Sequence, residues 1–184
     1  MPVPEGLPEF VVFVIFADMK RIIAIAALFA ALTLSVRAQE LKKVYDESID
    51  PMEQIDKALA QAKAQDKFVV CQLGGNWCPW CLRFAAFIEA DQDISKMIAD
   101  NYVYIHVNRN PRNEKTPEAK AAAERLMKRL GNAGRFGYPV FIILDGKGKV
   151  IHIQDSALLE KDNTYDKEKV LRFFKNWTPA VVNK

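Results

Sequence analysis

Two cysteines stand three positions apart in the stretch 77–81, which reads WCPWC. Cysteines with this spacing form a redox-active pair, half of a zinc site or part of a buried core. A structural zinc ion needs four ligands, and outside the pair the chain offers only Cys71, His106 and His152. Both histidines lie inside apolar strand patterns and lack ligand spacing. The residues therefore favour redox chemistry, and we expect no metal site.

The elements around the pair should place its first cysteine at the start of a helix. The apolar run Phe68–Leu73 predicts a buried strand that ends at two glycines. A helical pattern follows from Cys78 to about Ala90. Its expected buried stripe consists of Leu82, Ala85, Ala86 and Ile88. Cys78 then stands where free backbone N–H groups and the helix dipole favour a thiolate. Cys81 follows one turn later on the same face, within disulfide reach.

A thiolate with a second thiol beside it can exchange disulfides through a mixed intermediate. We therefore predict that Cys78 is the nucleophile and Cys81 the resolving thiol. Pro79 suits the first helical turn, where a missing N–H costs nothing. Trp77 and Trp80 would flank the exposed sulfur with apolar surface, and they either dock a polypeptide client or pack against the core.

The rest of the chain alternates helices and strands. Asp50 and Thr116 are expected to cap helices over 51–67 and 117–130, and shorter helices are expected over 94–99 and 167–177. Strands are expected over 102–108 and, as a hairpin, over 140–144 and 150–154. This order predicts an α/β fold with a mixed central sheet of about four strands flanked by helices. The charged stretch 108–115 is expected to be a solvated connector that could shape a partner surface.

The strand, the WCPWC motif, the following helix and the distant GYPVFIIL together resemble the thioredoxin superfamily over about residues 49–177. This resemblance implies a thioredoxin fold. It also implies that Pro139 is a cis proline facing the cysteines, and that Tyr138 offers its backbone to an extended substrate. Trp77 before the first cysteine is similar to thioredoxins, whereas Pro79 between the cysteines is similar to glutaredoxins.

One position departs from the thioredoxin pattern. Thioredoxins carry a buried aspartate six residues before the first cysteine, thought to accept the proton of the resolving thiol. The matching residue here is Gln72, which cannot take a proton. We expect water or another carboxylate to do this, or turnover to be slower. The third cysteine, Cys71, lies inside the apolar strand and is expected to be an inert core residue.

The N-terminal part of the chain has the pattern of an export signal. Residues 19–38 combine a basic start, an apolar run and small residues before Gln39, which predicts a signal peptide cut after Ala38. Residues 1–18 form an upstream extension, and residues 39–184 form a single thioredoxin-like domain. No cysteine follows the cut to receive a lipid, so we expect a periplasmic or secreted protein.

These patterns predict an exported thiol-disulfide oxidoreductase that acts on protein thiols and disulfides. It would need no bound cofactor. Trp77 favours a reductase over an oxidase, and a reductase in an oxidising compartment needs a donor such as a membrane-bound one. The net charge of +3 suggests no nucleic-acid partner, and we expect a monomer. The alternative is a non-catalytic thioredoxin-like module that binds proteins through Trp77, Trp80 and Tyr138.

Overall fold

The computed structural model describes residues 41–184. The signal peptide expected at 19–38 therefore lies outside the described residues. Within residues 41–184, no helix has both the length and the apolar character that crossing a membrane requires.

Helices and strands alternate along the described chain. The helices are α2 (Pro51–Ala64), α3 (Pro79–Ala90), α4 (Gln92–Asn101), α5 (Pro117–Arg129), α6 (Lys167–Asn176) and α7 (Pro179–Val182). The main strands are β1 (Phe68–Gly74), β2 (Tyr102–Asn108), β3 (Val140–Leu144) and β4 (Val150–Asp155). A short hairpin, β5 (Glu160–Lys161) and β6 (Thr164–Tyr165), precedes α6. Short 3-10 turns occur at 111–113, 133–136 and 156–159.

The four main strands form one mixed sheet in the order β2-β1-β3-β4. β1 runs parallel to β2, because the intervening α3 and α4 return the chain to the same edge. β3 is antiparallel to β1, and β4 to β3. The α/β fold with a mixed sheet of four strands flanked by helices is confirmed.

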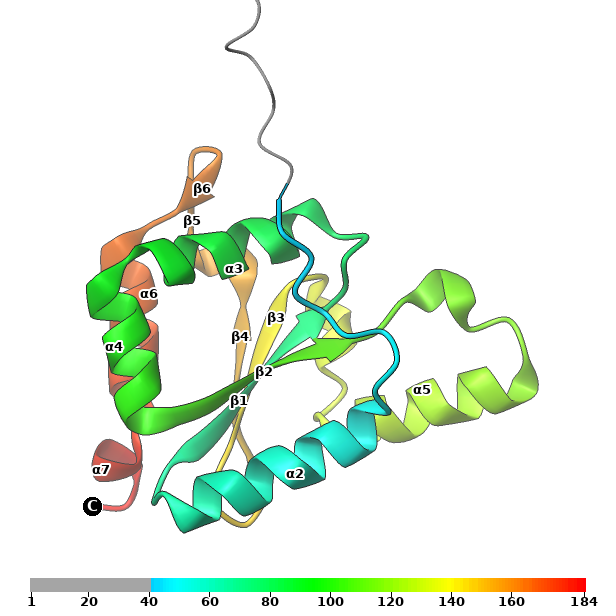
Figure 1. Cartoon of the computed structure of the whole chain (residues 1–184), viewed down its shortest axis with the longest axis horizontal. Helices are drawn as coiled ribbons and strands as arrows, with labels where there is room; N and C mark the ends of the chain where they lie inside the picture. The colour runs from blue at the N-terminus through cyan, green and yellow to red at the C-terminus, as the bar shows by residue number, and fades with distance from the viewer. Residues whose placement is uncertain (1–40) are drawn as a thin grey trace, which may run out of the picture. The chain divides into compact units, whose positions relative to one another are not determined.

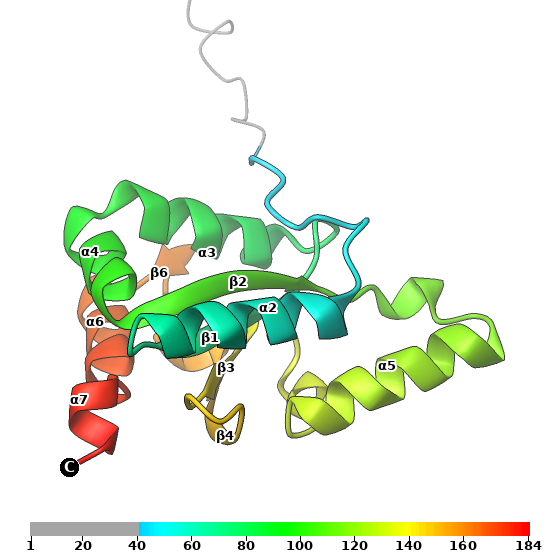
Figure 2. The ribbon, with the colours of Figure 1, turned by 60° about the horizontal axis from the view of Figure 1, so that its bottom comes forward.

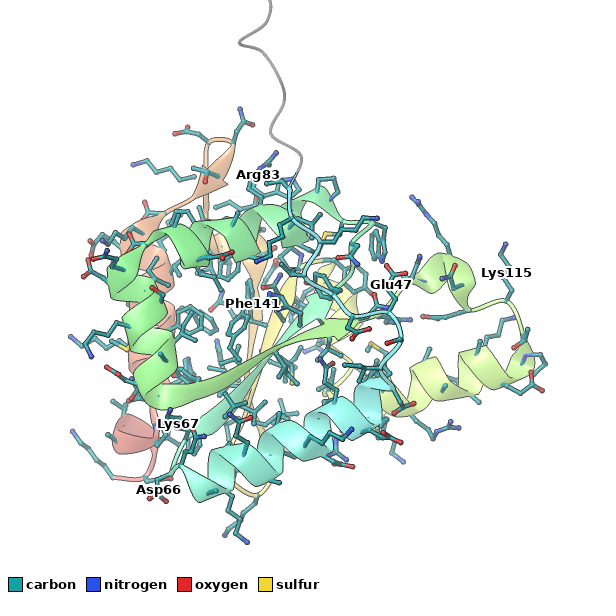
Figure 3. All side chains as sticks on the ribbon, viewed as in Figure 1. Glu47, Asp66, Lys67, Arg83, Lys115 and Phe141 are labelled. Atoms are coloured by element: carbon teal, nitrogen blue, oxygen red, sulfur yellow. A yellow bond between two sulfur atoms is a disulfide. The ribbon has the colours of Figure 1, made fainter. Side chains whose placement is uncertain are left out.

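The sheet lies in the middle of three layers (Figures 1 and 2). On one side, α2 and α5 cover the face that carries Val69, Cys71 and Leu73. On the other side, α3, α4 and α6 cover the face that carries Phe68 and Val70. Figure 3 shows Phe141 in the interior on this second side and Arg83 at the outer side of α3. Because successive strand residues point to opposite faces, Gln72 lies on the α3 side and Cys71 on the other.

Local signals set the ends of the helices. The Asp50 carboxylate accepts the backbone N–H of Met52 at 2.8 Å and of Glu53 at 3.0 Å. Pro51 follows at the first helical position. In the same way, the Thr116 hydroxyl accepts the N–H of Ala119 at 3.2 Å. Both predicted caps are present.

Two predicted burial patterns are wrong in detail. In α3 the exposed residue is Ala86, and Phe84 takes its place in the core with a side chain that is fully buried. In the last helix the apolar spacing predicts that Val170, Leu171, Phe174 and Trp177 are buried. In the structure Phe173 of α6 is also buried, whereas Leu171 and Trp177 are half-buried. Both helices have several apolar residues in succession, so periodicity alone does not decide which face turns inward.

Candidate functional site

The two cysteines of the motif form a disulfide where β1 gives way to α3. Cys78 is the N-cap residue of α3, and Cys81 stands in its first turn. Their Cα atoms are 5.3 Å apart, within the usual span of a disulfide. Pro79, at the first helical position, is exposed between them.

The backbone of the helix start contacts the Cys78 sulfur. The N–H of Cys81 donates to Cys78 Sγ at 3.2 Å, so the sulfur takes the place of a capping side chain. The N–H groups of Cys81 and Leu82 also donate to the Cys78 carbonyl at 3.1 and 3.2 Å. Free N–H groups and the positive helix end stabilise negative charge at this position. When the disulfide opens, a Cys78 thiolate is therefore favoured.

The two cysteines differ slightly in their exposure to solvent. Cys78 is 5% exposed, whereas Cys81 is 0% exposed. Both cysteines are buried, and Cys78 lies slightly nearer the surface than Cys81. The assignment of Cys78 as the nucleophile and Cys81 as the resolving thiol stays a prediction.

Trp77 and Tyr138 form one wall beside the disulfide. Their rings meet edge to face with centroids 5.3 Å apart. The peptide bond between Tyr138 and Pro139 is cis. The Trp77 indole N–H donates to the Arg109 carbonyl at 3.0 Å, and Arg109 Nη1 donates to the Tyr138 hydroxyl at 2.7 Å. Arg109 therefore joins both aromatic residues to the stretch 108–115.

The stretch 108–115 is less solvated than its charged composition predicts. Arg109 and Glu114 pair through two hydrogen bonds of 2.7 and 3.1 Å. Their side chains are only 18% and 21% exposed. The expectation of a solvated connector is wrong for these two residues, because a paired arginine and carboxylate satisfy each other away from water. Lys115, in contrast, points outward from the loop (Figure 3).

Trp80 borders the disulfide from α3 and is half-buried. Its ring meets the Tyr165 ring edge to face at 5.6 Å, and the Tyr165 hydroxyl donates to the Trp80 carbonyl at 3.1 Å. The Arg83 guanidinium stacks over the Trp80 ring at 4.4 Å. One face of this indole is thus occupied by a cation, which sequence reasoning missed.

Gln72 occupies the place of the thioredoxin aspartate and is fully buried. Its amide nitrogen donates to the Cys81 carbonyl at 2.9 Å and to the Tyr45 hydroxyl at 2.7 Å. Its amide oxygen accepts the Tyr104 hydroxyl at 2.5 Å. All of the amide's strong hydrogen-bonding partners are therefore neutral, and none is the expected carboxylate.

The segment before α2 is held against the motif by Asn76. The Asn76 side-chain oxygen accepts the N–H groups of Val44 and Tyr45, both at 3.1 Å. Its side-chain nitrogen donates to the Tyr45 carbonyl at 2.8 Å and to Glu47 at 3.1 Å. This clamp brings the Tyr45 side chain into the cluster that contains both cysteines.

Cys71 lies on the far side of the sheet from the disulfide, whereas the His106 ring meets the ring of Tyr45, which packs with the cysteines. Cys71 is buried on the α2 side of the sheet, and burial raises the pKa of its thiol to about 12. Burial lowers the pKa of His106 to about 4. In residues 41–184 no group of three or more histidine, cysteine or acidic side chains could hold a metal ion.

Sequence reasoning missed Tyr45, Asn76, Tyr104 and Arg109. Asn76 and Arg109 gave a weak signal, since both are polar residues within two positions of a strand end. Tyr45 gave none, because its contacts are with Gln72 and Asn76, far along the chain. Only the fold brings these residues together.

A sheet in this order, with a disulfide at the start of α3 and a cis proline before β3, defines a member of the thioredoxin superfamily. The chain belongs to the Thioredox_DsbH family, described as a protein of unknown function, DUF255, whose family model matches residues 34–178. A comparison with curated proteins found no significant match.

Solved structures resemble the chain at low sequence identity. A disulphide isomerase from Xylella fastidiosa Temecula1 is 22% identical, with a TM-score of 0.60, and the match covers 74% of this chain and 97% of that one. A DsbH oxidoreductase is 17% identical, with a TM-score of 0.46 and coverage of 77% and 89%. The C-terminal domain of Neisseria meningitidis DsbD, in its oxidised form, is 19% identical, with a TM-score of 0.46 and coverage of 72% and 97%. The first of these likenesses establishes the thioredoxin fold.

Proposed function

We propose that the protein is an exported thiol-disulfide oxidoreductase that exchanges disulfides with protein clients through Cys78 and Cys81. The observation that carries this proposal is the disulfide at the N-terminus of α3, with Cys78 at the helix start and Cys81 fully buried one turn later. The family match and the fold of the Xylella disulphide isomerase support it. No cofactor takes part, because both electrons reside in the two thiols.

In the reducing direction, the Cys78 thiolate attacks one sulfur of a client disulfide. This forms a Cys78–client disulfide and releases the other client sulfur as a thiolate, which takes up a proton. The Cys81 sulfur, after losing its proton, then attacks Cys78 Sγ. The intramolecular disulfide forms, the client's second thiolate leaves, and the Cys81 proton ends on it through water. The client gains two electrons and two protons, and the oxidising direction is the same sequence reversed.

An extended client segment would lie across the aromatic surface around the disulfide. We assign this surface to Trp77, Pro79, Trp80, Tyr138 and Pro139. The edge-to-face contact of Trp77 with Tyr138 and the exposure of Pro79 support the assignment. The client backbone would pair with the backbone of Tyr138, as in other strand-addition complexes. The ordered Arg109–Glu114 pair would hold the wall in place.

The direction of electron flow is proposed to be reduction of clients. The leading Trp77, similar to thioredoxins, supports this direction. An exported reductase needs a donor in an oxidising compartment, and a membrane-bound dithiol protein would fill that role. We propose that the mature chain begins near Gln39, works in the periplasm or outside the cell, and is a monomer.

The reduction potential of the Cys78/Cys81 pair tests the direction. It is measured by equilibrating the chain from Gln39 with glutathione buffers and trapping the free thiols. A value near about −270 mV is expected for a reductase with a dedicated donor. A value near about −120 mV would reverse the assignment to an oxidase of client thiols.

Insulin reduction tests whether the pair turns over at all. The parent is expected to reduce insulin disulfides when supplied with a dithiol donor. Absence of this activity, together with client binding that is unchanged in Cys78→Ser, would instead identify a non-catalytic binding module.

A further inference from the structure

The hydrogen bonds around Gln72 have a single possible direction. A carbonyl oxygen can only accept, so the amide group that contacts the Cys81 carbonyl must be the nitrogen. The amide oxygen then faces Tyr104, whose hydroxyl must donate to it. The second hydrogen of the amide nitrogen goes to the Tyr45 oxygen. The orientation of the side chain is fixed by chemistry as well as by shape.

This direction leaves the hydroxyl hydrogen of Tyr45 free. The Tyr45 oxygen accepts from Gln72, and within the described residues its O–H makes no hydrogen bond as a donor. Tyr45 is only 4% exposed, so bulk water is a poor alternative acceptor. Burial raises the pKa of Tyr45 far above its ordinary value, which keeps the hydroxyl protonated. A buried donor without an acceptor is costly, so a partner for this hydrogen is expected.

The sulfur of Cys81 is beside this hydroxyl. A Cβ placed on Gly74 would collide with Cys81 Sγ and would lie 2.7 Å from the Tyr45 hydroxyl. Both atoms therefore border the small space that the missing side chain leaves. Tyr45 and Cys81 also belong to one buried cluster with Cys78 and Leu82.

No hydrogen bond joins the Tyr45 hydroxyl to the Cys81 sulfur while the disulfide is closed. We propose that the hydroxyl donates one when the disulfide opens and so stabilises the thiolate that forms on Cys81. The inference rests on the proposed function, and it names the group that acts on the resolving cysteine in place of a buried carboxylate. Tyr45 keeps its proton, so it is not a base. The proton of the Cys81 thiol still leaves through water to the departing client thiolate.

The chain of donors strengthens the effect. Tyr104 polarises the Gln72 amide by donating to its oxygen, and the polarised amide donates more strongly to Tyr45. Each bond increases the acidity of the next hydrogen along the chain. The last hydrogen of this chain is the free one on the Tyr45 hydroxyl, and Asn76 holds the Tyr45 backbone beside the motif.

The test uses Tyr45→Phe, with Tyr102→Phe as the matched control. Tyr102 is also buried, but its hydroxyl donates to the Phe174 carbonyl at 2.6 Å, away from the cysteines. The first readout is the pH titration of Cys81 in a Cys78→Ser background. The NMR chemical shift of the Cys81 Cβ reports the protonation of the thiol at each pH. A hydrogen bond to a charged group is worth about 1.5–3 kcal/mol, so the midpoint should rise by about 1 to 2 pH units in Tyr45→Phe.

The second readout is the rate at which dithiothreitol opens the Cys78–Cys81 disulfide. Cys81 is the leaving group in this reaction, so the rate should fall about 3- to 10-fold in Tyr45→Phe. Tyr104→Phe should move both readouts in the same direction by a smaller amount, and it serves as the second variant if Tyr45→Phe does not fold. Tyr102→Phe should move neither.

An unchanged midpoint and opening rate in Tyr45→Phe would overturn the inference, as would equal changes in Tyr102→Phe. These readouts need no protein client. A parent that fails to reduce insulin but shows the Tyr45 effect would sink the proposed function and leave this inference standing. A parent that reduces insulin but shows no Tyr45 effect would overturn this inference and leave the proposed function standing.

Discussion

At the scale of single residues, the two sulfurs of the disulfide have different surroundings. The Cys78 sulfur accepts the backbone N–H of Cys81 at the start of α3, and Cys78 is 5% exposed. Cys81 is enclosed, with Gln72 on its carbonyl and Tyr45 beside its sulfur. The first environment suits a sulfur that meets clients, and the second suits one that waits for a partner inside the protein.

Replacing either cysteine should therefore give a different result. In Cys78→Ser, the rate of insulin reduction is expected to fall to the background rate, because the Cys78 thiolate is absent. The circular dichroism spectrum should not change. Cys81→Ser should still attack clients but should accumulate mixed disulfides, visible on non-reducing gels, because nothing resolves them. Full activity of Cys78→Ser would contradict the assigned roles.

Gly74 should tolerate no side chain. An added Cβ would meet the Cys81 sulfur and the Tyr45 hydroxyl, so Gly74→Ala must displace one of them. We expect it to lower the free energy of unfolding by about 1–3 kcal/mol, measured by urea denaturation of the oxidised protein. The control is Gly146→Ala, where an added Cβ meets nothing within 4 Å. Equal effects of the two substitutions would show that the space beside Gly74 can expand.

At the scale of elements, β2 carries the polar residues that meet the site. Tyr104 and His106 point to the same face of the sheet, and the ring of His106 meets the rings of Tyr45 and Tyr104 edge to face. His106 pairs with Gln72 in the β1–β2 register. Its Nε2 is buried and has no hydrogen-bond partner in the part of the chain that the structure describes.

The buried ring of His106 should make stability depend on pH. Its pKa of about 4 lies below the value of 6.5 expected when unfolded, so the unfolded chain binds the proton first. The neutral His106 therefore contributes to the free energy of unfolding, and this contribution is fully present above pH 6.5. It is lost as the pH falls towards 4, which lowers the free energy of unfolding by at most about 3 kcal/mol.

Urea denaturation at pH 7 and at pH 4.5 measures this loss. His106→Phe should flatten the difference between the two conditions, since the replacement cannot take a proton. His152 serves as the comparison, because burial also lowers its pKa but its ring stacks on Trp177 nearer the surface. A pH dependence that is the same in His106→Phe and the parent would rule out this histidine as its source.

The strands and helix starts that could be predicted from the sequence are those that depend on residues close together along the chain. The runs at 68–73 and 102–108 are continuous β-formers, and Asp50 and Thr116 carry capping side chains next to a proline. Each of these signals acts within a few residues. The Gln72–Tyr45 contact joins residues 27 positions apart, so no local pattern encodes it. The hairpin β5–β6 was also missed, because two-residue strands carry no period.

At the scale of the whole molecule, the sheet separates the third cysteine from the other two. Cys71 belongs to the cluster under α2 and α5, whereas the disulfide lies at the α3 side. A disulfide between the two sides would require β1 to leave the sheet. The fold thus keeps the third thiol away from the Cys78–Cys81 pair.

Cys71 should therefore react only when the protein unfolds. Burial raises the pKa of its thiol to about 12, so alkylation of the native reduced protein should modify Cys78 quickly and leave Cys71 unmodified, as mass spectrometry would show. Cys71→Ala should retain full insulin reduction and lose about 1 kcal/mol of unfolding free energy. Loss of activity in this variant at full stability would assign the thiol a redox role.

The clamp between Asn76 and the segment before α2 has a practical consequence for recombinant expression. A fragment trimmed to begin at Pro51 would keep the motif, every strand of the sheet and the cis proline. However, it would lack Tyr45, whose hydroxyl lies near the Cys81 sulfur. Such a truncated preparation could look folded and yet give misleading redox kinetics. The cleavage expected after Ala38 leaves this segment in place. A recombinant protein should therefore begin at Gln39 and not at Pro51.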